Sequence, residues 1–191
     1  MRLRLVTLTC LMLISIQNLS SQDTLKANIM DNRNFNTTLT VSQTPAELFK
    51  AINNVRGWWS EDIVGTTDKL NSEFDYHFED VHKCKMKIVE LVPDKRIVWL
   101  VKENFFKFTN DKSEWIGNKI IFDITKAGDK TELHFTQVGL VPEYECFEIC
   151  EKAWTQYVQQ SLKSLVTTGK GQPNAKGKPQ TSDELKHSGK H

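Results

Sequence analysis

The sequence is poor in the residues that build cysteine-based metal or redox sites. It has only four cysteines and five histidines among its 191 residues. No two cysteines form a C-x-x-C pair, and no histidines stand beside them at the spacing of zinc ligands. These absences exclude the common zinc motifs and the thioredoxin-type motif. We therefore expect neither a metal nor another cofactor.

Long hydrophobic runs and an excess of one charge are also missing. The longest predominantly apolar run, residues 5–16, is too short to cross a bilayer as a helix. We therefore expect no stable membrane insertion once the chain is processed. The net charge is only +1, and basic residues gather at the two ends, which leaves the middle mildly acidic. Because phosphate backbones require a basic face, a nucleic-acid partner is not expected.

Residues 1–22 have the layout of a secretory signal peptide. Arg2 and Arg4 precede the apolar run, and small polar residues follow it, although no clean small-residue cleavage site is present. This layout predicts export to the periplasm or the medium, with a polar linker over residues 23–32. The alternative is a wrongly assigned start codon or a buried N-terminal segment, and the protein would then be cytoplasmic.

Residues 33–168 are predicted to form one domain that starts with a strand and a short helix. Apolar and polar residues alternate over residues 35–41, as in a half-buried strand. Thr44 and Glu47 then form a capping box, with Pro45 at the first helical position. A short helix therefore begins directly after the first strand.

Further strand-like segments follow, and one long helix comes last. The strands are expected at residues 74–78, 84–88, 96–101, 119–125 and 131–138, and residues 102–113 are interpreted as a connection. The helix is expected over residues 142–168, where apolar side chains recur at three-to-four spacing and need a sheet to pack on. Helical periodicity of this length appears only at the end, so the fold class is α+β rather than α/β.

Residues 169–191 are rich in Gly, Pro, Lys and Ser and contain almost no apolar residue. Such a composition cannot bury enough surface to offset the entropy of ordering. We therefore expect a disordered basic tail.

A series of short motifs appears in a specific order along residues 33–168. They are TPAELF at 44–49, Trp58-Trp59, PDKRIVW at 93–99, TELHFTQVG at 131–139, and the final helix with Trp154 and Leu162. In this order they resemble the START-like (SRPBCC, Bet v 1-type) superfamily. More narrowly, the chain is similar to bacterial single-domain proteins grouped with activators of the heat-shock protein 90 ATPase.

The resemblance implies a helix-grip fold. In that fold a bent antiparallel sheet of about six or seven strands wraps round the long C-terminal helix, with a cavity between them. The family offers no shared catalytic constellation. The chaperone-activator role belongs to two-domain eukaryotic members, and it is not transferred to this single domain.

Aromatic residues are the main candidates for the wall of such a cavity, because they combine apolar area with polar N–H and O–H groups. The candidate ligand-binding residues are Trp58, Trp59, Tyr76, Trp99, Trp115, His134, Cys150, Trp154 and Tyr157. For any one tryptophan, ordinary core filling is the simpler interpretation. Alternation along the strand puts His134 on the face opposite Leu133 and Phe135, and either face could line the cavity. His77 and His82 are predicted to face solvent.

Cys146 and Cys150 are four residues apart on the predicted last helix. They are interpreted as two reduced thiols that pack as small hydrophobes. A local disulfide is the second interpretation if the protein is exported, although this spacing fits disulfide geometry poorly. A metal site is the third, and it would require two further ligands.

We expect a non-catalytic domain that binds a small hydrophobic or amphipathic ligand in the cavity. The first alternative is a protein-interaction module resembling a chaperone cofactor, and the second is a START-like cyclase or hydrolase. An aromatic-lined cavity favours ligand binding, a filled core with an exposed apolar patch favours interaction, and a titratable pair in the cavity favours an enzyme. The sequence leaves the oligomeric state open.

Overall fold

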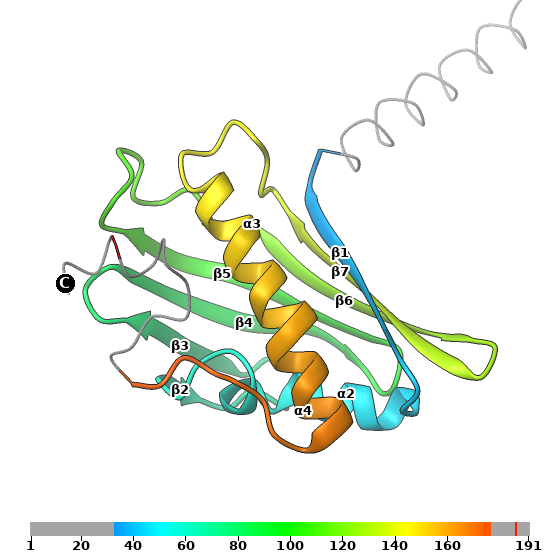
Figure 1. Ribbon diagram of the computed structural model, residues 1–191. Coiled ribbons are helices and arrows are strands. Elements are labelled where there is room, and N and C mark those ends of the chain that lie inside the picture. Colours follow the sequence, from blue (N-terminus) through cyan, green and yellow to red (C-terminus); the bar gives the residue numbers. More distant parts are fainter. Residues whose placement is uncertain (1–32, 177–185, 187–191) are drawn as a thin grey trace, which may run out of the picture. The chain divides into compact units, whose positions relative to one another are not determined.

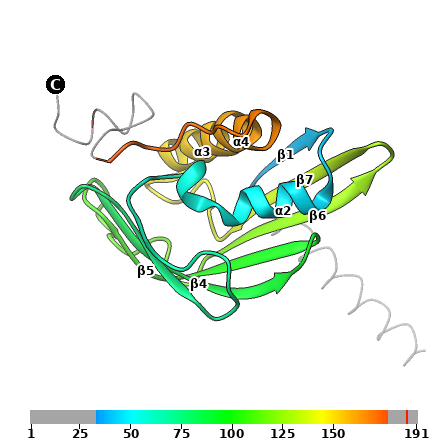
Figure 2. The same ribbon diagram turned by 90° about the horizontal axis from the view of Figure 1, so that it is seen from below.

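The computed structural model describes residues 33–176 and 186, and these form a bent antiparallel sheet with helices on one face (Figures 1 and 2). The signal peptide and linker predicted for residues 1–32 lie outside the described residues. Within the described part, no helix is long and apolar enough to cross a membrane. The α+β helix-grip fold expected from the sequence is confirmed.

The sheet has seven strands in the order β1-β7-β6-β5-β4-β3-β2. Every neighbour in this order except β1 and β7 is also a neighbour along the chain, so hairpins build most of the sheet. The strands are β1 Phe35–Val41, β2 Ile63–Gly65, β3 Glu73–Phe78, β4 His82–Val92, β5 Arg96–Phe106, β6 Lys119–Ala127 and β7 Lys130–Val138. β5 continues to Phe106, into residues 102–113 that were expected to form a connection. The pairing of β4 with β5 contains two register shifts.

The short helix α2, Pro45–Asn53, begins at the predicted capping box. The Thr44 hydroxyl accepts the Glu47 backbone N–H at 3.2 Å, and the Glu47 carboxylate accepts the Thr44 backbone N–H at 2.7 Å. The helix buries Leu48 and Ile52 completely. A single 3₁₀ turn, η1 Val55–Gly57, then leads into the two tryptophans Trp58 and Trp59.

The C-terminal helix crosses the face of the sheet in three consecutive parts (Figure 1). These are α3 Phe147–Gln156, the π-helical turn η2 Tyr157–Leu162, and α4 Lys163–Thr168. The helix therefore begins later than predicted, because residues 142–146 form turns. The π turn buries four of its six residues, Tyr157, Val158, Ser161 and Leu162. Wider turns of this kind occur often at functional sites in other proteins.

The disorder predicted from residue 169 onward is wrong for residues 170–176, which we call the C-terminal strap. Asn174 is 1% exposed, its N–H donates to the carbonyl of Trp59, and its carbonyl accepts the N–H of Glu61, both at 2.9 Å. Gln172 N donates to the hydroxyl of Ser161 at 2.7 Å. Specific hydrogen bonds, and not apolar area, fix this segment, so composition could not predict it. The rest of the predicted tail, apart from Lys186, lies outside the described residues.

Candidate functional site

A small cavity of about 40 Å³ lies between the last helix and strands β3, β4 and β5. Six of the predicted ligand-binding residues line it: Trp59, Tyr76, Trp115, Cys150, Trp154 and Tyr157. The remaining lining residues are Phe78, Val81, His82, Phe106, Phe108, Ile149 and Ala153. The lining is thus almost entirely apolar, and aromatic rings dominate it.

A continuous array of aromatic rings from the sheet, the helix and a loop lines the cavity. Trp59 stacks on Tyr76 with ring centres 4.5 Å apart and contacts Trp154 at 5.1 Å. Trp154 also faces Trp115 at 6.0 Å. The indole N–H of Trp154 donates to Oε1 of the buried Gln137 at 2.6 Å. This bond fixes the orientation of the largest side chain that the helix contributes to the cavity.

Three of the predicted ligand-binding residues lie elsewhere. Trp58 and Trp99 are fully buried behind the cavity wall, stacked on each other at 6.4 Å, and Trp58 donates its indole N–H to the carbonyl of Ile52. His134 is exposed on the outer face of β7, where Nδ1 lies 3.2 Å from the hydroxyl of Thr38. Because Leu133 occupies the core face, strand alternation forces His134 outward.

His82 is the main functional candidate that sequence analysis missed, because it was expected to face solvent. Its ring lies 4.3 Å from that of Phe106, 5.0 Å from that of Trp115 and 5.1 Å from that of Tyr76. Burial among these rings lowers its pKa to about 3. The sequence could have indicated this position, since His82 is two residues before the buried Cys84 and so points to the same face of β4. His77 does lie at the surface, as predicted.

The three cysteines within the described residues are free thiols. Cys84, Cys146 and Cys150 are buried, and none forms a disulfide, so the disulfide interpretation for Cys146 and Cys150 is not supported. Burial raises the pKa of Cys84 well above its ordinary value, which makes this thiol unreactive at neutral pH. Over the described part of the chain, no cluster of three His, Cys, Asp or Glu side chains could hold a metal ion.

Two glutamates join the loop after β5 to the segment before α3, next to the cavity residues Trp115 and Ile149, and we call this pair the carboxylate clasp. Glu114, which is 8% exposed, accepts the backbone N–H groups of Glu145 at 2.6 Å and Cys146 at 3.0 Å. In return, Glu145 accepts the backbone N–H of Asn110 at 3.0 Å and that of Asp111 at 3.3 Å. These backbone hydrogen bonds lower the pKa of Glu145. The clasp ties the loop after β5 to the start of α3.

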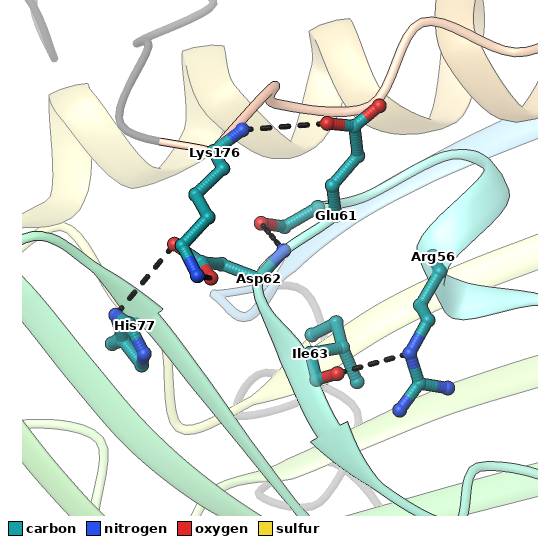
Figure 3. Close-up of polar contacts among 7 residues, drawn as sticks. Arg56, Glu61, Asp62, Ile63, His77 and Lys176 are labelled. Atoms are coloured by element: carbon teal, nitrogen blue, oxygen red, sulfur yellow. Dashed lines mark hydrogen bonds and ion pairs between the residues drawn. The ribbon is translucent and has the colours of Figure 1, made fainter.

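A second polar cluster holds the C-terminal strap beside β2 (Figure 3). The Lys176 ammonium lies 3.6 Å from one oxygen of Asp62, and His77 Nδ1 lies 3.9 Å from the other. The Lys176 N–H donates to Glu61 at 3.4 Å, and Arg56 donates to the carbonyl of Ile63 at 2.9 Å. This cluster is at the surface and supports the backbone next to Trp59. It does not reach the cavity.

Comparison with known families identifies the domain. The family model described as "Activator of Hsp90 ATPase homolog 1-like protein" matches residues 42–167, more than half of the chain. The chain belongs to this family. The matched region begins directly after β1, includes strands β2 to β7 and every cavity residue described above, and ends within α4.

Solved structures show the same fold for the Activator of Hsp90 ATPase homolog 1-like domain. The solution structure of the Aha1 dimer from Colwellia psychrerythraea is 23% identical, with a TM-score of 0.59, and the match covers 72% of this chain and 98% of that one. Protein SSP2350 from Staphylococcus saprophyticus is 12% identical, with a TM-score of 0.52 and 74% and 98% coverage. DynU16, a putative protein in the dynemicin biosynthetic locus, is 13% identical, with a TM-score of 0.53 and 73% and 49% coverage. Comparison with curated proteins gives no match.

Proposed function

We propose that this domain binds a small, uncharged, mainly apolar ligand in the cavity under α3, without catalysing a reaction on it. The observation that supports this most strongly is the composition of the lining, in which aromatic side chains converge and no Lys, Arg, Asp or Glu takes part. Burial of apolar ligand surface provides roughly 25 cal/mol per Å² without any specialised chemistry. The fold leaves this space between sheet and helix.

The cavity is too small for a typical ligand, which indicates that the structure represents a closed form of the domain. Its volume of about 40 Å³ is far below the roughly 300–1,000 Å³ of typical small-molecule sites. A ring-sized ligand therefore requires movement at the solvent side, where Phe108, Ile149 and Ala153 are only half-buried. Phe108 belongs to the loop and Ile149 to the helix that the carboxylate clasp joins, so release of the clasp would widen the opening.

A catalytic role is less well supported. A general base is most effective when its pKa lies near the working pH, but burial lowers the pKa of His82 to about 3. Its described hydrogen-bond partner is the neutral amide of Asn104. No carboxylate lines the cavity to form an acid–base pair with it.

A protein-interaction role also has less support. The large apolar side chains exposed over the described residues are spread across β2, β4, β5 and two loops: Val64, Leu70, Val89, Val92, Phe105 and Ile116. An interaction surface normally shows them gathered in one patch.

Native mass spectrometry of the purified full chain tests the proposal. We expect a species with added mass that denaturation releases and that identifies the ligand class. Ala153→Leu, which fills the cavity from α3, should lose the added mass. Lys152→Leu adds the same side chain at an exposed position of α3 and should retain it. Equal occupancy in both variants, or no binding of any small apolar compound to the wild type, would contradict the proposal.

We also propose that the chain is exported. The support is the layout of residues 1–22, which lie outside the described structure. N-terminal sequencing of the mature protein tests this: a mature end near residue 23 is expected, and an intact Met1 in the cell interior contradicts it.

A further inference from the structure

We propose that the cavity selects an uncharged aromatic ligand that carries a hydroxyl group, with Trp115 donating a hydrogen bond to that hydroxyl and His82 accepting one from it. This rests on the proposed function and adds the ligand class and the two residues that recognise it.

The donor is the indole N–H of Trp115. The side chain is 3% exposed and lines the cavity, and its Nε1 has no hydrogen-bond partner among the described residues. A buried donor without a partner is costly, and a ligand oxygen placed opposite it removes that cost. Trp154, whose ring faces that of Trp115 at 6.0 Å, already donates its indole N–H to Gln137 and so cannot donate it to a ligand.

The acceptor is Nδ1 of His82, and a relay of hydrogen bonds fixes its protonation. Asn104 Nδ2 donates to the carbonyl of Lys112 at 3.1 Å, which turns its Oδ1 toward His82. An amide oxygen only accepts, so His82 Nε2, at 3.1 Å, must carry the proton. In a neutral imidazole the other nitrogen then has a free lone pair. No hydrogen bond to Nδ1 is present within the described chain, and the lowered pKa keeps the ring neutral.

A hydroxyl group matches this pair because it donates and accepts at the same time. The ring centres of His82 and Trp115 lie 5.0 Å apart, so both are within reach of one small ligand. An ether or ketone oxygen could satisfy Trp115 but could not donate to His82. A carboxylate or ammonium group would lose its hydration without meeting an opposite charge, because none lines the cavity. The surrounding rings favour a flat aromatic body.

The test compares 4-methylphenol with p-xylene, which has a similar shape but no hydroxyl. Affinities are measured by calorimetry on the wild-type full chain and on Trp115→Phe and Trp99→Phe. The second variant is the matched control, because Trp99 Nε1 also has no partner among the described residues but Trp99 lies outside the cavity. We expect wild type to bind 4-methylphenol about tenfold more tightly than p-xylene. Trp115→Phe should reduce the preference for 4-methylphenol over p-xylene by about 3–10-fold, whereas Trp99→Phe should keep the preference.

A wild-type measurement makes the test independent of whether the variants fold. In a ¹⁵N-correlated spectrum, 4-methylphenol should move the indole N–H signal of Trp115 downfield, as a new hydrogen bond does, and p-xylene should not. Equal affinity for the two probes, with no downfield shift, overturns the hydroxyl selectivity but leaves ligand binding intact. Failure of both probes to bind at millimolar concentration overturns the proposed function and the inference together.

Discussion

The backbone N–H of Glu145 donates to the buried carboxylate of Glu114 at 2.6 Å, and this bond connects the two segments on the solvent side of the cavity. Glu114 is next to Trp115, and Glu145 is one turn before Ile149 on α3. Both Trp115 and Ile149 line the cavity. If the cavity binds a ligand as proposed, the stability of this contact should affect how easily the ligand enters.

Replacement of Glu114 by alanine should lower the free energy of unfolding by about 1–3 kcal/mol, because the N–H groups of Glu145 and Cys146 lose their acceptor. It should also speed ligand association, since the loop is no longer held to the helix. Urea denaturation and stopped-flow fluorescence measure the two effects. Glu148→Ala is the control, because Glu148 is an exposed acid of α3 outside the clasp, and it should change stability by less than about 0.5 kcal/mol. An unchanged unfolding free energy in Glu114→Ala would rule out the clasp.

The stability of the domain should fall on acidification through His82. Its pKa is about 3 in the folded protein and about 6.5 in the unfolded chain. Between these values the unfolded state binds a proton that the folded state does not. The contribution of His82 is therefore fully present above pH 6.5 and is lost as the pH falls toward 3, by up to about 1.4 kcal/mol per pH unit.

His82→Phe isolates this effect from carboxylates that titrate in the same range. Denaturant unfolding at several pH values should give a shallower slope between pH 6 and 4 in the variant than in wild type. Identical slopes in the two proteins would mean that His82 is solvated and not buried among Phe106, Trp115 and Tyr76.

The C-terminal strap should contribute measurably to stability. Asn174 donates its side-chain N–H to the hydroxyl of Tyr157 at 2.6 Å in a buried site. Asn174→Ala removes this bond and should cost about 0.5–1.5 kcal/mol. Lys170→Ala changes an exposed side chain of the same segment and should remain within about 0.5 kcal/mol of wild type. Thermal unfolding checks both, and equal midpoints would contradict the packed position of the strap.

Trp154→Ala should abolish ligand binding and lower stability by about 3–5 kcal/mol, because the side chain is 2% exposed and forms part of the cavity wall. Trp154→Phe keeps much of the packing but leaves Oε1 of Gln137 without its donor. It should therefore cost less than the alanine variant. Chemical denaturation orders the two variants, and a stable, ligand-binding Trp154→Ala protein would be inconsistent with the position of α3.

Much of the fold could be predicted because it depends on local patterns. The capping box at Thr44 and the alternation along β1 and β7 each determine a local structure within a few residues. The late start of α3 could not be predicted in this way, because it depends on Glu114, a residue far away in sequence that accepts the N–H groups before the helix. The strap was missed for the same reason: Asn174 is ordered by Trp59, Glu61 and Tyr157.

Sequence periodicity could predict which side chains of a helix or strand point toward the core, and therefore part of the cavity lining. Trp154 and Tyr157 follow the helical stripe, and both line the cavity. Trp99 also points to the core face of its strand, but it lies deeper in the core than the cavity wall. Only the packed structure distinguishes a residue in the wall from one behind it. His82 follows the parity of β4 and could have been found, although its hydrogen bond to Asn104 required the strand register.

The most direct measurement is isotope-filtered NMR on the labelled protein with an unlabelled small aromatic such as p-xylene. We expect nuclear Overhauser contacts from the ligand methyl groups to Trp115, Ile149 and Ala153, which line the cavity from both sides. Contacts confined to exposed residues such as Val64 and Leu70, or no contacts at saturating ligand, would contradict a binding cavity under α3.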